Sequence, residues 1–327
     1  MRHGLGATLQ KLRPRYAMLT VDAEALPRRA AARHVERLLW GVHNSGTAGV
    51  REMCSLGDDV GVKHVFFVDP CGAYSAIGKL LDVVRWLDSH GQDVQLHTHP
   101  ETLPASFWET QGCNAQPALM NEYSDDARAA FVIKHFGEMI SAVTGKPILA
   151  FRAGSFRWNA STIRALGAES IPLSFNNSMR AYQAGRCYHG LPTNYPYRWS
   201  NGVIEVPVTE MRVRPHPGGA EFWASLTYPE SPYFPFCTEP SPWLGGLRRK
   251  SPAFSVFLLH SWSLLYWDEN GHATYRDDQR LEGYRKLLSK LTKDYDVITT
   301  RDFLDLHARG KIPINHTVDI EKAAYRK

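Results

Sequence analysis

The chain has 327 residues, with 38 Lys and Arg against 33 Asp and Glu, so its formal net charge at pH 7 is +5. Hydrophobic residues make up 43% and charged residues 22%, a balance typical of a globular protein with a substantial core. This composition excludes wholesale disorder, a collagen-like chain and a coiled coil. Because the small basic excess is spread along the chain, no nucleic-acid partner is predicted.

The sequence also bears on the cellular setting. The longest weakly polar stretch, Phe254 to Trp267, is too short for the roughly 20 apolar residues of a spanning helix. The first residues lack the apolar run of a secretory signal, so we expect a cytoplasmic protein without a transmembrane segment. The five cysteines lack a CxxC pair, which favours reduced thiols.

Strand-like and helix-like patterns alternate along the chain. The predicted strands are 16–24, 62–68, 94–99, 148–152, 171–175, 203–208, 254–260 and 296–299, and the predicted helices are 29–40, 75–90, 125–143 and 278–291. This alternation is typical of an α/β fold with a largely parallel sheet. Seven or eight such units favour a closed or nearly closed barrel, and the lack of a third glycine after Gly4-Leu5-Gly6 argues against a dinucleotide site.

One segment departs from this rhythm. Residues 212–250 contain seven prolines and seven aromatic residues, and a long loop of this kind inside a compact domain is usually functional or disordered. We predict a single barrel domain over residues 1–327 in which 212–250 form an inserted loop over the barrel mouth. A subunit contact is the alternative, since aromatic residues are also enriched at interfaces.

Polar residues at the ends of two predicted strands outline a metal site. Side chains alternate along a strand, so Asp22 and Glu24 share one face, as do His97 and His99. Two carboxylates and two imidazoles that face one another can bind a divalent cation. Zinc suits this donor set, and nickel or cobalt would fit nearly as well.

Two more strand ends carry unusual polar groups. Arg152 ends the strand 148–152 and can clamp a carboxylate through two hydrogen bonds. His260 is the single titratable group of the strand 254–260. In parallel α/β barrels the active site lies at the C-terminal strand ends, so both are candidate functional residues.

Four motifs in this order, Asp22-x-Glu24, His97-Thr-His-Pro, Arg152-Ala-Gly-Ser-Phe156 and Leu258-Leu-His260, resemble those of the polysaccharide deacetylase superfamily, with its NodB homology domain, and of carbohydrate esterase family 4. The likeness runs from about residue 19 to residue 306. It implies a distorted TIM-like (β/α)7 barrel and a metal-dependent hydrolysis of an N-acetyl or O-acetyl group of a saccharide.

The resemblance also implies roles for single residues. Asp22 would be the catalytic base, Arg152 would hold that base and His260 would be the general acid, while Glu24, His97 and His99 would bind the metal. The family's second motif has two histidines four residues apart, which places Glu101 at the second position. Glu101 therefore stays open as a ligand beside His99.

Further residues are candidates for substrate contact or support. Trp158 and Trp262 would form a wall for the sugar or pack in the core, and Asn176 and Asn177 would contact substrate hydroxyls or form a turn. Asp69 would support the metal ligands or form a turn before Pro70.

The predicted function is a metal-dependent sugar deacetylase that acts on a precursor of a cell-surface polysaccharide, nucleotide-linked or lipid-linked, with oligomerisation left open. A hydrolase of a small non-sugar amide and a catalytically inactive sugar-binding or assembly protein are the two alternatives, because fold alone does not fix function.

Overall fold

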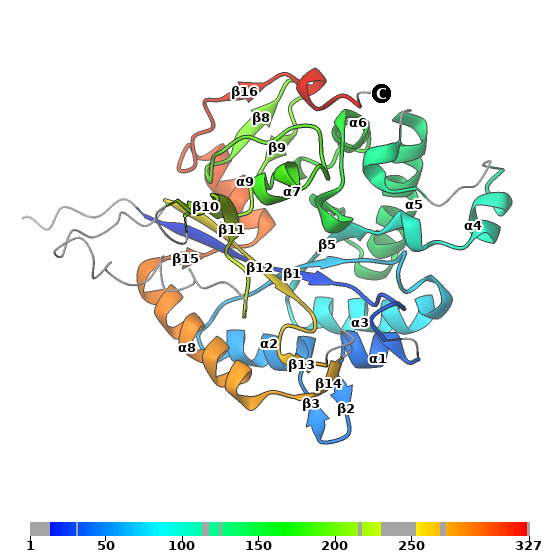
Figure 1. The fold of residues 1–327 in the computed structure, drawn as a ribbon, viewed down its shortest axis with the longest axis vertical. Helices are drawn as coiled ribbons and strands as arrows, with labels where there is room; N and C mark the ends of the chain where they lie inside the picture. Colours follow the sequence, from blue (N-terminus) through cyan, green and yellow to red (C-terminus); the bar gives the residue numbers. More distant parts are fainter. Residues whose placement is uncertain are drawn as a thin grey trace, which may run out of the picture.

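The computed structural model describes residues 14–30, 32–112, 118–123, 126–214, 218–229, 253–268 and 273–325. Its centre is a curled sheet in which seven neighbouring strands run parallel (Figure 1). In sheet order they are β12 (Phe254–His260), β1 (Tyr16–Ala23), β4 (Val65–Val68), β5 (Asp93–Thr98), β6 (Ala150–Ala153), β7 (Leu173–Ser174) and β9 (Ile204–Glu205). Each overlaps a predicted strand, so the (β/α)7 barrel expectation is confirmed.

Three short strands extend this sheet. β8 (Tyr197–Trp199) runs antiparallel to β9, and β16 (Thr317–Val318) runs parallel to β8. The predicted last strand is present as β15 (Asp296–Val297), which pairs with the start of β1. The edge formed by β8 and β16 was not predicted, because neither strand is long enough to show an alternating pattern.

The two faces of the sheet bury two separate apolar layers. Along β1, Tyr16 and Met18 point into the barrel, whereas Leu19 and Val21 pack outward against the helices. Phe303 closes one end of the interior, since it packs in the same cluster as Tyr16 and Met18. This alternation fixes which polar side chains at the strand ends face the interior.

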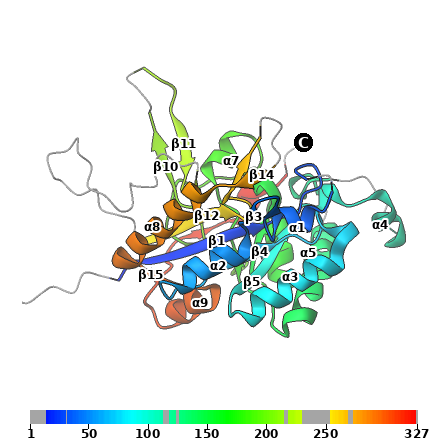
Figure 2. The same cartoon turned by 90° about the horizontal axis from the view of Figure 1, so that it is seen from below.

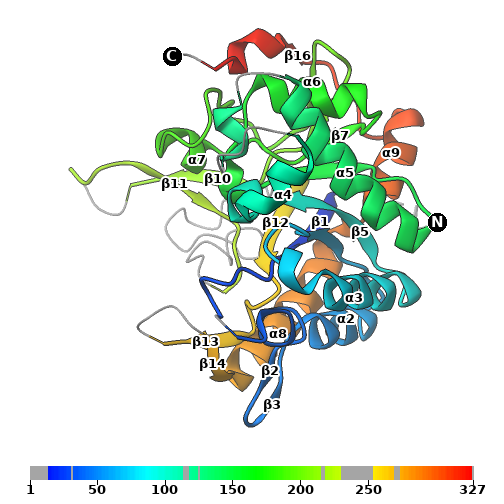
Figure 3. The same cartoon turned by 90° about the vertical axis from the view of Figure 1, so that its right-hand side faces the viewer.

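Helices cover the outside of the sheet (Figures 1 and 3). The longer ones are α2 (Val50–Asp58), α3 (Ile77–Ser89), α5 (Asp126–Thr144), α6 (Ala160–Ala168), α8 (Asp278–Asp294) and α9 (Thr300–Ala308). Short elements at the ends of the barrel are α1 (His34–Leu38), α4 (Ala105–Thr110) and α7 (Met179–Gln183), with the hairpins Val42–His43/Gly46–Thr47 (β2, β3), Glu210–Val213/Phe222–Ser225 (β10, β11) and Leu265–Trp267/Ala273–Arg276 (β13, β14). Within the described ranges, every helix is too short or too polar to span a bilayer.

The helix predicted over 29–40 is mostly wrong. Only α1 forms, because Arg33 at its N-terminal boundary adopts a left-handed conformation with φ 53°. A helix cannot extend back through such a residue. The helices predicted over 75–90, 125–143 and 278–291 are confirmed as α3, α5 and α8.

Part of the 212–250 segment belongs to the barrel wall. The hairpin of β10 and β11 stands out from the barrel in Figure 2, and the chain then returns to β12. The Leu226 N–H donates to Thr209 O at 2.8 Å, and the Leu258 N–H of β12 donates to Leu226 O at 2.8 Å. These bonds close the seam between β9 and β12. Residues 215–217 and 230–252, and with them most of the predicted loop, lie outside the described residues.

Candidate active site

Six polar side chains meet inside the barrel at the C-terminal ends of its strands. They are Asp22, Glu24, His97, His99, Arg152 and His260. On β1, Asp22 has the same parity as Tyr16 and Met18, which point inward, and the same alternation holds on β5, β6 and β12. The sequence prediction that these residues come together is therefore matched by the described geometry.

Asp22 and Arg152 form a buried ion pair. The Arg152 Nη1 donates to Asp22 Oδ1 at 2.5 Å, and the Arg152 side chain is fully inaccessible to solvent. The Nη2 group donates to Thr20 Oγ1 at 2.9 Å, and the Thr20 hydroxyl in turn donates to Phe257 O at 2.6 Å. Asp22 is thereby fixed in orientation and has a positive partner.

Thr20 was missed in the sequence analysis. Its signal is parity, because Thr20 precedes Asp22 by two residues on β1 and must face the same side.

Glu24, His97 and His99 form the candidate metal centre. The Nε2 atoms of His97 and His99 lie 2.9 and 3.1 Å from the same Glu24 oxygen, Oε1. Their other ring nitrogens are also occupied, since His97 Nδ1 lies 2.8 Å from Arg152 O and His99 Nδ1 lies 2.7 Å from Glu101 Oε1. Because acceptors hold the Nδ1 protons, the Nε2 atoms, which face Glu24 Oε1 without a cation, are the ones that would bind one after losing their protons. The donor set therefore fits a divalent cation.

Glu101 contacts the edge of the His99 ring that faces away from Glu24. Its carboxylate meets Nδ1, whereas Glu24 meets Nε2, so the two carboxylates lie on opposite edges of one imidazole. The chain turns at His99, where the His99 N–H donates to Asp69 Oδ1 at 3.1 Å. This geometry places Glu101 where it orients the His99 ring.

The electrostatics of the cluster are dominated by burial and by the opposite charges within it. Burial alone would raise the pKa of Glu24, but the charges and hydrogen bonds of His99 and His97 outweigh it and hold that pKa well below its usual range. Burial works against the charged form of His99, yet Glu24 and Glu101 raise its pKa well above 6.5. In the absence of a cation, positive imidazoles thus hold the site together.

His260 ends β12, where it lies in register with Asp22 of the neighbouring β1. One nitrogen or oxygen of each of Asp22, Glu24 and His260 lies within 4.8 Å of the others. The His260 ring stacks on Trp262 with centroids 4.9 Å apart and 21° between planes, and the Arg29 guanidinium lies 4.8 Å from the Trp262 ring. His260 is thus a half-buried imidazole beside both carboxylates.

The other predicted substrate contacts lie deeper. Trp158 is fully buried and packs edge-on against Trp199, with centroids 5.7 Å apart. Asn176 is also fully buried: its Oδ1 accepts from the Ala153 N–H at 2.7 Å and its Nδ2 donates to Ser174 at 2.9 Å. The Asn176 amide is thus engaged by the scaffold, and Trp158 lies in the buried core.

Glu205 was also missed in the sequence analysis. It is buried between β7 and β9, where its carboxylate accepts from the Asn176 and Asn177 N–H groups at 2.6 and 2.7 Å and from Trp199 Nε1 at 3.0 Å. Burial raises the pKa of Glu205 to about 7. Nothing in the local sequence pattern distinguishes it from an exposed strand residue.

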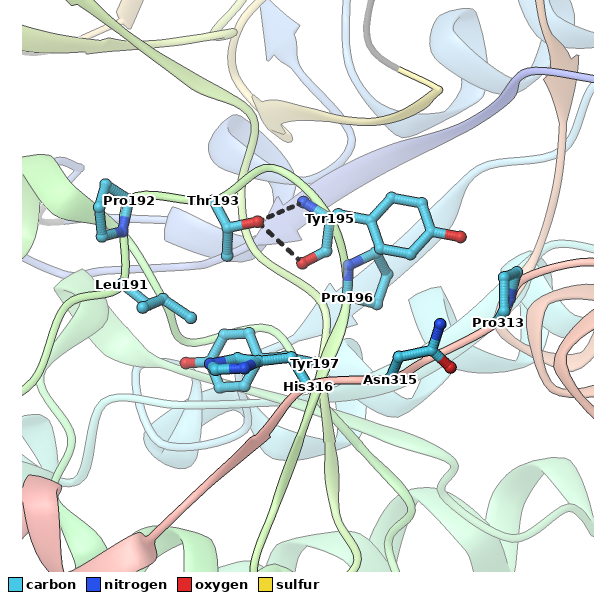
Figure 4. A pocket seen from close by; sticks show the side chains of 9 residues that line it. All are labelled: Leu191, Pro192, Thr193, Tyr195, Pro196, Tyr197, Pro313, Asn315 and His316. Carbon is cyan, nitrogen blue, oxygen red and sulfur yellow. Dashed lines mark hydrogen bonds between the residues drawn. The ribbon is translucent and has the colours of Figure 1, made fainter.

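A hollow of about 440 Å³ is lined by residues outside the cluster (Figure 4). Residues from 191–197 and 313–316 line it, and Pro and Tyr side chains dominate its wall. None of its lining residues belongs to the predicted site. The Thr193 hydroxyl is used locally, since it bonds to the Tyr195 backbone at 3.0 and 3.3 Å.

Comparison with solved structures supplies relatives of this fold. A proposed polysaccharide deacetylase from Mycobacterium smegmatis matches with a TM-score of 0.55 at 13% identity, covering 94% of this chain and 95% of its own. The chain therefore has the same fold as this protein. Family 4 carbohydrate esterases also match, including one from Bacillus anthracis at 12% identity, a TM-score of 0.40 and coverages of 89% and 83%.

The chain is also similar to part of a larger protein. A 4-alpha-glucanotransferase from Thermococcus litoralis matches with a TM-score of 0.56 at 11% identity, over 95% of this chain but only 42% of that one. No family model and no curated protein sequence matches the chain. At these identities the similarity establishes the fold, and the chemistry must be argued from the site itself.

Proposed function

We propose that the protein is a metal-dependent hydrolase that removes an acetyl group from a saccharide. The observation that carries the proposal is the convergence of two imidazoles on Glu24 Oε1 beside the buried Asp22–Arg152 pair. The polysaccharide deacetylase fold supports the same reading.

The proposed metal ligands are Glu24, His97 and His99, and zinc is the proposed native ion, with nickel and cobalt as alternatives. When bound, such a cation supplies Lewis acidity toward the acetyl carbonyl. Glu101 and the Arg152 carbonyl orient the two imidazoles from behind.

Asp22 and His260 are the proposed proton carriers. Asp22 Oδ2 is free to accept a proton from the attacking water, because Arg152 binds Oδ1. Arg152 stabilises the ionised carboxylate. His260 then donates a proton to the departing amine or alcohol oxygen, which is a poor leaving group without it. Trp262 keeps the His260 ring in place.

The test is metal content followed by acetate release. Protein purified without chelators should contain about one equivalent of metal, and His97→Ala should contain little. The wild type should then release acetate from N-acetylated oligosaccharides. A metal-loaded wild type that releases no acetate from any acetylated sugar would remove the deacetylase proposal. A chain that binds no zinc, nickel or cobalt would remove the metal centre as well.

A further inference from the structure

Three arginines gather beside the candidate active site. Arg157 comes directly after the 3-10 turn that follows β6, and an isolated parallel bridge between Trp158 and Cys187 places Arg157 next to Arg186. Arg180 is on α7, which the chain leaves through a turn in which the Arg186 N–H donates to Ala181 O at 3.0 Å. The backbone therefore brings three guanidinium groups to one part of the rim.

Glu210, an acidic residue beside α7, is bound by groups other than the side chains of these arginines. Glu210 accepts from the Met179 N–H at 2.5 Å and from the Arg180 N–H at 3.2 Å, so it binds the start of α7 and not a guanidinium group. Within the described part of the chain, neither a salt bridge nor a side-chain hydrogen bond is made by Arg157, Arg180 or Arg186. Partial desolvation, Arg157 and Arg180 all lower the pKa of Arg186. An assembly of like charges of this kind favours an anion.

The arginines adjoin the catalytic centre. Phe156 separates Arg157 from the site, and its ring centroid lies 5.8 Å from the Arg152 guanidinium. Ser155 and Phe156 both adopt left-handed conformations, with φ 53° and 55°, so the chain bends sharply there. Arg157 therefore directly follows a residue whose ring faces the Arg152–Asp22 pair.

The geometry points to an anion subsite, formed by Arg157, Arg180 and Arg186, that binds a phosphoryl or diphosphoryl group attached to the saccharide. A single arginine satisfies a carboxylate with two hydrogen bonds, whereas three guanidinium groups match a multiply charged anion with several acceptor oxygens. The statement that the anion is attached to a saccharide rests on the proposed function. The subsite itself stands on the three arginines.

The direct test uses inorganic pyrophosphate as the probe. Calorimetric titration should show binding to the wild type that weakens by about tenfold in Arg157→Gln and in Arg186→Gln, which each remove charge-assisted hydrogen bonds. Arg85→Gln is the matched control, because Arg85 is an exposed arginine of α3 paired with Asp82. Absence of binding, or binding that neither variant weakens, as expected if pyrophosphate meets only the metal, would overturn the subsite.

A kinetic test assigns the anion to a substrate. The ratio of kcat/KM for a diphosphate-linked N-acetyl sugar over a neutral N-acetyl disaccharide should fall about tenfold in Arg186→Gln and stay unchanged in Arg85→Gln. Nucleoside-diphosphate sugars and short polyprenyl-diphosphate sugars are tested separately, which identifies the group attached to the diphosphate. Should neither sugar be hydrolysed, the proposed function fails while pyrophosphate binding still tests the subsite. An unchanged ratio would overturn the substrate assignment.

Discussion

Asp22 is a buried carboxylate. One of its oxygens bonds to Arg152, and the other is the proposed acceptor of a proton from water. Asp22→Asn keeps the shape and the acceptor oxygen but removes the base. We expect kcat for acetate release to fall by about 10²- to 10⁴-fold while metal content stays the same. Steady-state kinetics and elemental analysis check this.

The same substitution should lower thermal stability, because it leaves the buried Arg152 without its counter-charge. Activity is therefore compared at a temperature well below the Tm of the variant. Retention of activity within about tenfold of the wild type would show that another group is the base.

Glu101 contacts His99, one of the proposed metal ligands, at Nδ1. We expect Glu101→Ala to raise the Kd for zinc by about 10- to 100-fold, and Glu101→Gln to have a smaller effect because the amide oxygen still accepts from Nδ1. Competition against a chromogenic chelator measures both. Glu109→Ala, an exposed glutamate of α4, is the control. Equal zinc affinity in Glu101→Ala and the wild type would contradict the orienting role.

Among the secondary-structure elements, the turn after β6 packs directly against His99, a proposed metal ligand. A Cβ atom on Gly154 would lie 2.5 Å from His99 Nδ1 and 2.6 Å from its Cγ, so the imidazole would have to move. We expect Gly154→Ala to weaken zinc binding and to cost about 1–3 kcal/mol of stability. Chemical denaturation and zinc titration measure the two effects.

Gly78→Ala is the matched control for that substitution. Gly78 lies in α3 with no atom within 4 Å of an added Cβ, so alanine should be neutral or stabilise by up to about 1 kcal/mol. If Gly154→Ala behaves like this control, the close packing between the turn and His99 is not important for metal binding.

The sequence was informative where a pattern is local. Alternation along β1 and β5 predicted that Asp22 joins Glu24 and that His97 joins His99. It was not informative for long-range pairing, such as the closure of the barrel by Leu226. A short strand paired with a distant partner leaves no periodicity to read.

The role of Glu101 also could not be predicted from the sequence pattern. Whether it binds a metal or supports His99 depends on the direction in which the chain leaves β5. That direction is set by the bond from the His99 N–H to Asp69, a residue 30 positions earlier.

For the protein as a whole, the buried cluster of Glu24 and His99 links pH to stability. Glu24 has a lowered pKa, so its contribution is present above about pH 4.5 and is lost as pH falls through the folded-state pKa. His99 has a raised pKa, so its contribution is complete below about pH 6.5 and is lost as pH rises through the folded-state pKa. The metal-free protein should therefore have its highest Tm in the mildly acidic range.

Bound metal should restore the stability that is lost as pH rises, because it binds the neutral imidazoles. We expect the gain in Tm on adding zinc to grow as pH rises from about 5 to about 8 in scanning fluorimetry. Burial raises the pKa of Glu205 to about 7, so ionisation of Glu205 also lowers stability as pH rises. Comparison with His99→Asn separates the contribution of the cluster from that of Glu205. A zinc-induced gain that is equal at all pH values would contradict this linkage.

The seam of the barrel has a consequence for solubility. Because Leu226 and Tyr228 bond to Leu258 of β12, the chain between Val208 and Phe254 supplies part of the wall as well as the projecting hairpin. A shortened chain that joined Val208 directly to Phe254 would leave β12 with an uncovered edge, and uncovered apolar edges pair with other molecules. Such a deletion should therefore yield aggregates and not a smaller enzyme.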